Sequence, residues 1–307
     1  MNRCLCCNKD LNDNNIIWHE SCIKKFFNTT DLPKVDLKDY NYTFLNKGDK
    51  KSIITGVQKK LSLALEKKGT YPRLTLINFP SGYILKPNTL EYPFLCENEF
   101  LTMHLANLCN IETVPFGLIE LEDKSLAFIT KRIDRNHNKK IPMEDFCQLG
   151  NKLTEQKYKS SYEQVGKIVS TYSDNIGLDY YKLFNLILFS FIVGNSDMHL
   201  KNFSLIKLKG NYVLAPAYDL LNTIIVTNDS EELALTICGK KNKLKKDNFI
   251  KLAKSYNLLD KQIERIFNNY KKNKPLIIDT ITSSLLSEDL KEKYISIVEN
   301  RYNRLFN

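Results

Sequence analysis

The chain has 307 residues, 43% of them hydrophobic and 26% charged, a composition typical of a globular protein with one large domain or two small ones. It starts without an apolar leader, and its longest apolar run, residues 183–193, is too short to span a bilayer, so we expect a cytoplasmic protein rather than a secreted or membrane-bound one. The net charge of +10 suits an acidic partner, but the lysines are scattered singly and in pairs, which favours a solvated basic surface over a nucleic-acid-binding stripe.

The N-terminus carries four of the eight cysteines. The pair Cys4-x-x-Cys7, followed by His19-x-x-Cys22, has the pair–loop–pair spacing of a structural zinc site, with Cys6 as a surplus thiol. The alternative is a set of buried thiols beside a surface histidine, and the spacing favours zinc over it. The other cysteines lie singly in apolar segments, so the sequence predicts no disulfide framework.

Polar residues 31–50 are typical of a linker, and the pattern from 51 to 130 is mostly β. Within this β-rich stretch, the apolar residues of 97–108 recur at helical spacing and predict one helix. The predicted strands are 61–65, 74–77, 82–87, 118–121 and 126–130.

After about residue 141 the pattern becomes helical. Asp145 can cap a helix start, and the apolar segment 181–193 predicts a buried helix. Short β-like runs on either side of Gly210 predict a hairpin. Amphipathic segments follow Asp247 and Asp260, and another covers residues 290–306.

A β-rich half with one helix, followed by a helical half, predicts an α+β, two-lobed fold. We expect a Cys/His unit with its linker at residues 1–45, a β-rich N-lobe at 46–133 and a helical C-lobe at 134–307.

The most informative motif begins at Gly194, where Asp197 is followed five positions later by Asn202 and then by Asp219. Phosphoryl transfer needs this set, because one carboxylate takes the proton of the attacking hydroxyl while the amide oxygen and the second carboxylate hold Mg²⁺. The alternative is an ordinary turn rich in Asn, Ser and Asp that has no catalytic role.

Three further features fit the same chemistry. A glycine beside hydroxyl residues at Gly56, with Lys60 nearby, lets backbone N–H groups approach phosphates, although an ordinary turn looks the same. Lys86 ends a strand and can pair with phosphates if Glu99 or Glu97 holds it. Residues 130–135 join the two halves, where a kinase places the hinge that binds adenine.

Seven ordered motifs resemble the HipA family of bacterial serine/threonine kinases, and the resemblance covers roughly residues 50–300. They are Gly56-Val57-Gln58-x-Lys60-Leu61, Ile84-Leu85-Lys86-Pro87, Asn98-Glu99, Lys131-Arg132-Ile133-Asp134-Arg135, Glu144-Asp145-Phe146-Cys147-Gln148, Gly194-Asn195-x-Asp197-x-His199-x-Lys201-Asn202-Phe203-Ser204 and Leu214-Ala215-Pro216-x-Tyr218-Asp219-Leu220-Leu221.

The resemblance implies a kinase-like fold, ATP and Mg²⁺ as cofactors, and a toxin that phosphorylates a translation component such as an aminoacyl-tRNA synthetase. It also implies autophosphorylation that inactivates the kinase, at Ser52 or Thr55. The other implied roles are Asp197 as catalytic base, Asn202 and Asp219 as Mg²⁺ ligands, and Gly56, Gln58, Lys60, Lys86, Lys131, Ile133 and His199 as ATP contacts.

The chain departs from the family pattern before the phosphate loop, where it has about 50 residues instead of a longer β-rich subdomain. It therefore resembles the short HipT form, which implies a small antitoxin protein that supplies the missing subdomain and a DNA-binding antitoxin, with DNA contacted only indirectly. Two alternatives remain: a nucleotide-binding pseudokinase that acts as a scaffold or corepressor, and a small-molecule or lipid kinase on the same fold.

Overall fold

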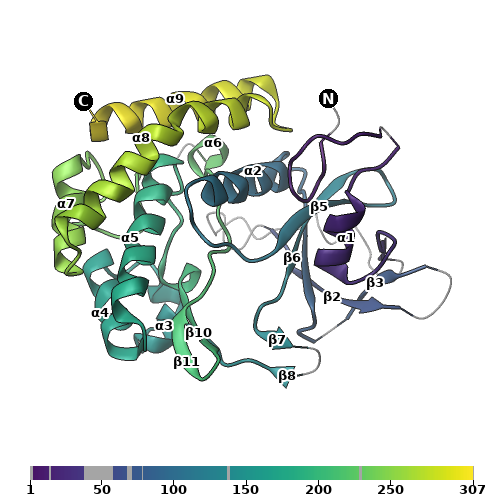
Figure 1. Cartoon of the computed structure of the whole chain (residues 1–307), viewed down its shortest axis with the longest axis horizontal. Coiled ribbons are helices and arrows are strands. Elements are labelled where there is room, and N and C mark those ends of the chain that lie inside the picture. The colour runs from purple at the N-terminus through teal and green to yellow at the C-terminus, as the bar shows by residue number, and fades with distance from the viewer. Residues whose placement is uncertain are drawn as a thin grey trace. The chain divides into compact units, whose positions relative to one another are not determined.

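The structure is a computed structural model that describes residues 3–13, 15–37, 58–67, 71–77, 79–136, 139–227 and 230–306 (Figure 1). The chain divides into two compact units. Unit 1 comprises Met1–Phe100 and Val114–Lys140, and unit 2 comprises Leu101–Thr113 and Ile141–Asn307. The domain boundaries expected from the sequence stay a prediction. The phosphate-loop residues Ser52, Thr55 and Gly56 lie outside the described residues.

Unit 1 is built on a six-stranded sheet with the strand order β1-β3-β2-β4-β6-β5. The pair β1–β3 is parallel, and the other neighbours are antiparallel. A two-stranded hairpin, β7 with β8, follows the sheet in the chain. The strands are β1 (Lys34–Asp36), β2 (Leu61–Glu66), β3 (Arg73–Leu76), β4 (Tyr83–Pro87), β5 (Phe116–Glu120), β6 (Leu126–Lys131), β7 (Arg135–Asn136) and β8 (Lys139–Lys140).

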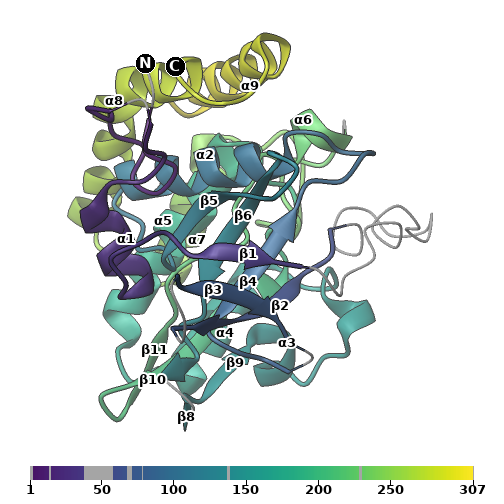
Figure 2. The same cartoon turned by 90° about the vertical axis from the view of Figure 1, so that its right-hand side faces the viewer.

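The N-terminal segment packs on this sheet, and α1 (Glu20–Phe27) lies beside it (Figure 2). Trp18, Phe26, Phe27 and Tyr83 form an aromatic cluster with ring centroids 4.7–5.9 Å apart. Together with leucines of β2, β3 and β4 they make the apolar core of unit 1. Burial of apolar surface stabilises the folded state by about 25 cal/mol per Å² removed from water. Because Trp18, Phe26 and Phe27 belong to the N-terminal segment, the core of unit 1 depends on that segment.

Hydrogen bonds fix the N-terminal segment to the edge strand β5. The N–H of Leu118 donates to the carbonyl of Leu5 at 2.7 Å, and the indole N–H of Trp18 donates to the carbonyl of Leu118 at 2.9 Å. A Cβ on Gly117 would lie 2.6 Å from the Trp18 ring, so only glycine permits this close approach. The segment therefore covers an edge that would otherwise expose unpaired backbone groups.

Unit 2 holds a three-stranded sheet with the order β11-β10-β9 and most of the helices. Its strands are β9 (Met143–Asp145), β10 (Ser204–Leu208) and β11 (Asn211–Leu214). Its helices are α3 (Phe146–Leu149), α4 (Tyr162–Tyr172), α5 (Ile176–Ile192), α6 (Ile224–Thr227), α7 (Lys246–Ser255), α8 (Asp260–Thr282) and α9 (Glu288–Phe306), with short 3₁₀ turns η2 (Thr154–Gln156) and η3 (Leu200–Asn202). Helix α2 (Leu95–Leu108) begins in unit 1 and ends in unit 2.

Local sequence signals predicted these elements well. Helix α5 is buried from Leu183 to its end, as its apolar composition predicted. Asp145 caps α3 with a reciprocal bond to Gln148, although that helix has only four residues. The hairpin turn lies at Lys209 and Gly210, which both have positive φ.

A buried ion cluster joins α9 to the loop that follows α6. Glu232, whose side chain is 12% exposed, accepts from Arg301 at 2.6 Å and from Arg304 at 2.5 Å. Burial would raise the pKa of Glu232, but the hydrogen bonds from Arg304, the Leu244 N–H and Arg301 outweigh it and lower the pKa to about 2.

This lowered pKa gives a pH-dependent prediction. The carboxylate contributes stability that is fully present above its unfolded pKa of 4.5 and is lost as the pH falls through about 2. Wild type should therefore exceed Glu232→Gln in free energy of unfolding at pH 7, and the difference should shrink as the pH falls below 4.5. Urea unfolding between pH 7 and pH 3 measures it, with Glu288→Gln, at an 83% exposed side chain, as the control. A difference that does not change with pH would contradict the assignment.

Candidate active site

The loop that carries the phosphoryl-transfer motif is fixed at its start. It leaves α5 at Gly194, which has a φ of +72°, and a Cβ there would lie 3.0 Å from the amide oxygen of Asn222. The hydroxyl of Thr223 accepts the Ser196 N–H at 2.7 Å and donates to the Gly194 carbonyl at 3.2 Å. A buried side chain thus fixes the backbone before the aspartate.

Asp197 lies at the centre of this loop and is 7% exposed. Its carbonyl accepts from the Asn202 amide at 2.9 Å and from the His199 N–H at 2.8 Å, so the Asp–Asn spacing closes into one hydrogen-bonded turn. One carboxylate oxygen accepts a hydrogen bond from the hydroxyl of Tyr158. The arrangement presents a carboxylate on a rigid loop, as a proton acceptor requires.

Sequence reasoning did not find Tyr158, which lies 39 residues before Asp197 and belongs to no motif. Its ring also meets that of His199 edge-on, with centroids 5.0 Å apart. His199 is 2% exposed, and the preceding Met198 carbonyl accepts from the Tyr162 hydroxyl at 3.0 Å. Aromatic residues after β9 therefore orient the loop from one side.

Asn202 and Asp219 are the candidate metal ligands of unit 2. The side-chain amide nitrogen of Asn202 donates to the Asp197 carbonyl, so the side-chain oxygen of Asn202 is the atom that could coordinate a metal. Asp219 has a φ of +56°, and the hydroxyl of the preceding Tyr218 bonds to Ser204 at 2.6 Å and to the Lys201 carbonyl at 3.1 Å. An amide oxygen and a carboxylate are the hard oxygen ligands that Mg²⁺ prefers, so the donor set fits it.

In unit 1, Lys86 and Glu99 form a buried ion pair. The ammonium of Lys86 lies 2.6 Å from Glu99 Oε1, and the two side chains are 6% and 2% exposed. Of the two candidate partners named above, Glu97 instead accepts from Asn88 at 3.0 Å, and burial raises its pKa. The ring of Phe128, 5.4 Å from the ammonium, covers the cation.

Gln58 and Lys60 lie just before the start of β2. Gln58 donates to the carbonyl of Pro87 at 3.1 Å, which places it beside the strand end that carries Lys86. Lys60 is exposed.

Lys131 and Ile133 lie in the segment expected to bind adenine. The Lys131 ammonium donates to the Phe26 carbonyl at 3.1 Å, and its backbone N–H donates to the Pro115 carbonyl at 2.9 Å. Burial and the nearby Lys67 lower the pKa of Lys131. The backbone N–H of Lys131 and one N–H of its ammonium are therefore engaged within unit 1, and the adenine contacts of Lys131 and Ile133 stay a prediction.

The four candidate zinc ligands of the N-terminus converge in unit 1, with their ligand atoms within 4.8 Å of one another. All eight cysteines are free thiols, and only Cys238 is exposed.

The comparisons with known proteins settle the family. The model of the HipA-like C-terminal domain matches residues 52–275. The chain belongs to the HipA-like family. This confirms the resemblance seen in the motifs.

Curated relatives of the chain carry kinase names. A Haemophilus influenzae protein named "putative kinase" is 30% identical over 270 residues, which cover 82% of this chain and 75% of that protein. The Sinorhizobium fredii "putative kinase" Y4dM is 29% identical, over 78% of this chain and 66% of its own length. The serine/threonine-protein kinase toxin HipA of Shewanella oneidensis is 28% identical, over 60% of this chain and 46% of that protein.

Solved structures show the same fold. HipA from the Shewanella oneidensis complex of HipA, HipB and operator DNA superposes with a TM-score of 0.68 at 20% identity, over 93% of this chain and 70% of that one. The Helicobacter pylori proinflammatory kinase CtkA gives a TM-score of 0.51 at 14% identity, over 75% of this chain and 90% of that one. The predicted α+β, kinase-like fold is confirmed. Among the described residues, no helix has the length and apolar character that crossing a membrane requires.

Proposed function

We propose that this HipA-like chain is an ATP- and Mg²⁺-dependent protein serine/threonine kinase that acts as the toxin of a toxin–antitoxin system. The observation that carries the proposal is the hydrogen-bonded turn of Asp197 and Asn202. Asp219 would supply the second metal oxygen. The buried Lys86–Glu99 pair supports it, because a lysine held in this way is the phosphate-binding cation of protein kinases.

Each of these residues has its own role in the proposed phosphoryl transfer. Asp197 accepts the proton of the acceptor hydroxyl, and Tyr158 keeps its carboxylate oriented. Lys86 offers positive charge to the phosphates, and Glu99 fixes the ammonium. Asn202 and Asp219 would hold Mg²⁺, which when bound supplies charge for the phosphate oxygens.

Partners follow from the relatives and the motifs. The Shewanella HipA was solved with HipB and operator DNA, so we propose a DNA-binding antitoxin here, with DNA contacted only through it. A second, small antitoxin protein and a translation component such as an aminoacyl-tRNA synthetase as substrate are proposed on the resemblance alone.

Transfer of labelled phosphate from ATP to a cell lysate tests this function. Label in proteins supports a protein kinase. Label found only in the lipid or small-molecule fraction would indicate a kinase of another substrate class. Nucleotide binding without any transfer would indicate a pseudokinase.

Autophosphorylation is predicted in the segment that holds Ser52 and Thr55, with Ser52 favoured. A phosphoserine carries close to two negative charges at neutral pH and would repel the phosphates of ATP from the adjacent loop, so transfer to other proteins should fall as the modification accumulates. Intact-mass analysis and peptide mapping after incubation with Mg·ATP measure it. A Ser52→Ala/Thr55→Ala variant that still modifies itself to the same level would contradict the prediction, and phosphate on Thr55 alone would only correct the residue.

A further inference from the structure

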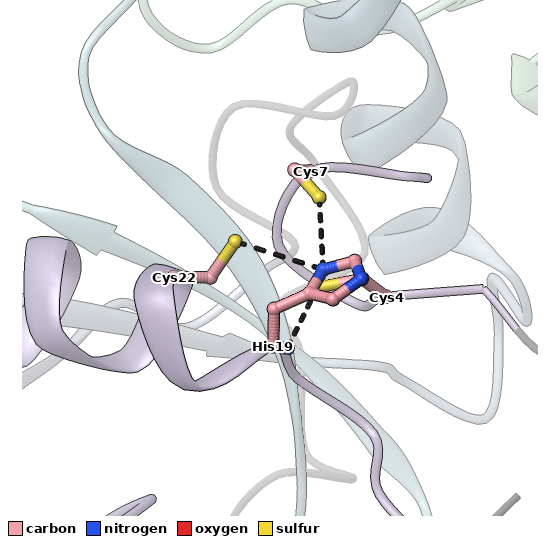
Figure 3. Close-up of side chains that lie close together, drawn as sticks. All are labelled: Cys4, Cys7, His19 and Cys22. Carbon is pink, nitrogen blue, oxygen red and sulfur yellow. Dashed lines mark hydrogen bonds between the residues drawn. The ribbon is translucent and has the colours of Figure 1, made fainter. Parts of the chain in front are cut away.

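Two short motifs of the N-terminal segment meet in space. Cys4 and Cys7 lie in a tight turn, in which the N–H of Asn8, with a φ of +57°, donates to the Cys4 carbonyl at 2.9 Å. His19 precedes α1, and the Cys22 N–H donates to the His19 carbonyl at 2.9 Å, so Cys22 lies in the first helical turn. The four side chains point toward one another (Figure 3).

The dimensions of the cluster are those of a tetrahedral metal site. The Cys7 and Cys22 sulfurs lie 3.4 Å and 4.0 Å from His19 Nδ1, and all four ligand atoms are within 4.8 Å of one another. Zinc bonds of ~2.3 Å to sulfur and ~2.0 Å to nitrogen place tetrahedral ligands roughly 3.5–3.8 Å apart. A metal ion therefore needs only a small contraction of the cluster.

The orientation of His19 is set for coordination. Its Nε2 lies 3.1 Å from the carbonyl oxygen of Asp10, and since a carbonyl can only accept, Nε2 carries the proton. Nδ1 then presents its lone pair to the sulfurs, and a carbonyl behind the ring is the partner that metal-ligating histidines use. The His19 backbone N–H also donates to the Cys4 sulfur at 3.4 Å, which stabilises a thiolate there.

We propose that Cys4, Cys7, His19 Nδ1 and Cys22 bind one Zn²⁺ ion as a structural site. Binding replaces the three thiol protons, which are released, with three sulfur–zinc bonds and one nitrogen–zinc bond. All four positions come from the protein, so no open position remains for catalysis. The ion joins the Cys4–Cys7 turn to α1 and thereby holds Leu5 and Trp18, which hydrogen-bond to the edge strand β5.

Cys6 provides a matched control inside the same segment. Its sulfur faces the carbonyl of Phe116 at 3.9 Å, and it is not one of the four clustered ligands. The test is elemental analysis of the full chain purified under reducing conditions without chelator. We expect one zinc per chain for wild type and Cys6→Ser, and a loss of at least tenfold for Cys22→Ser. Wild type that holds no zinc even after incubation with zinc chloride, or Cys22→Ser with wild-type zinc content, would overturn the proposal.

A second variant keeps the test valid if Cys22→Ser does not fold. Cys22→His retains four ligands and should still bind one zinc. After exchange for Co²⁺, it should show the visible absorption of a tetrahedral site and weaker sulfur charge-transfer absorption than wild type, because one thiolate is gone. Cobalt spectra with no charge-transfer absorption in wild type, or a melting temperature that does not fall when a chelator removes zinc, would refute a structural Cys₃His site.

Discussion

Asp197→Asn is expected to lower phosphoryl transfer by roughly 10²–10⁴-fold, the usual contribution of a general base. The substituted amide keeps the size of the carboxylate, and its oxygen can still accept from the Tyr158 hydroxyl, so the loop should stay in place. The amide cannot, however, take the proton from the hydroxyl group that receives the phosphate. Incorporation of labelled phosphate into the chain itself and into a lysate measures the loss.

Tyr158→Phe is the matched control for Asp197→Asn, since it removes the hydroxyl that orients the carboxylate but keeps the carboxylate itself. It should lose much less activity than Asp197→Asn. Unchanged urea midpoints for both variants exclude unfolding as the cause. Transfer by Asp197→Asn at close to the wild-type rate would remove Asp197 from the mechanism.

Lys86→Met is expected to cost about 3–5 kcal/mol of stability and to weaken the binding of Mg·ATP. Removal of the ammonium takes away a cation that pairs with the Glu99 carboxylate, which is 2% exposed. The double variant Lys86→Met/Glu99→Gln removes both charges, so it should recover most of the stability. It should not recover nucleotide binding, which needs the cation itself. Urea unfolding and titration calorimetry with Mg·ATP separate the two effects.

A second ion pair of unit 1 provides the control for Lys86. Lys124 lies 2.6 Å from Glu120, the same distance as in the buried pair, but its side chain is 80% exposed. Lys124→Met should therefore cost less than ~1 kcal/mol. If Lys86→Met costs no more than Lys124→Met, or if the double variant is as unstable as the single one, the buried pair does not have the proposed energetic role.

The sequence was informative wherever structure depends on near neighbours. The apolar run of α5, the positive-φ turn at Gly210 and the cap at Asp145 each follow from a few adjacent residues. The choice between Glu97 and Glu99 could not be made in this way. Two residues apart, they lie about 200° apart around α2, and only the placement of β4 against the helix decides which one meets Lys86.

Long-range packing explains the other features that the sequence did not predict. Tyr158 reaches Asp197 because of how the segment before α4 lies against the loop, and no spacing rule indicates it. The parallel pairing of β1 with β3 joins residues almost forty positions apart. Pro275 lies inside α8, where a local rule would end the helix.

The boundaries of the family match, residues 52–275, are not the boundaries of a folding unit. The match begins after Trp18 and Phe27, which fill the core of unit 1, and it ends inside α8, before the buried Tyr302 whose hydroxyl donates to the Tyr270 carbonyl at 3.0 Å. A fragment cut at these limits would present a bare apolar sheet face and an open β5 edge to solvent, the combination that drives aggregation. The family match thus marks the residues that the HipA-like C-terminal domain shares with this chain, whereas independent folding requires the residues on both sides of it.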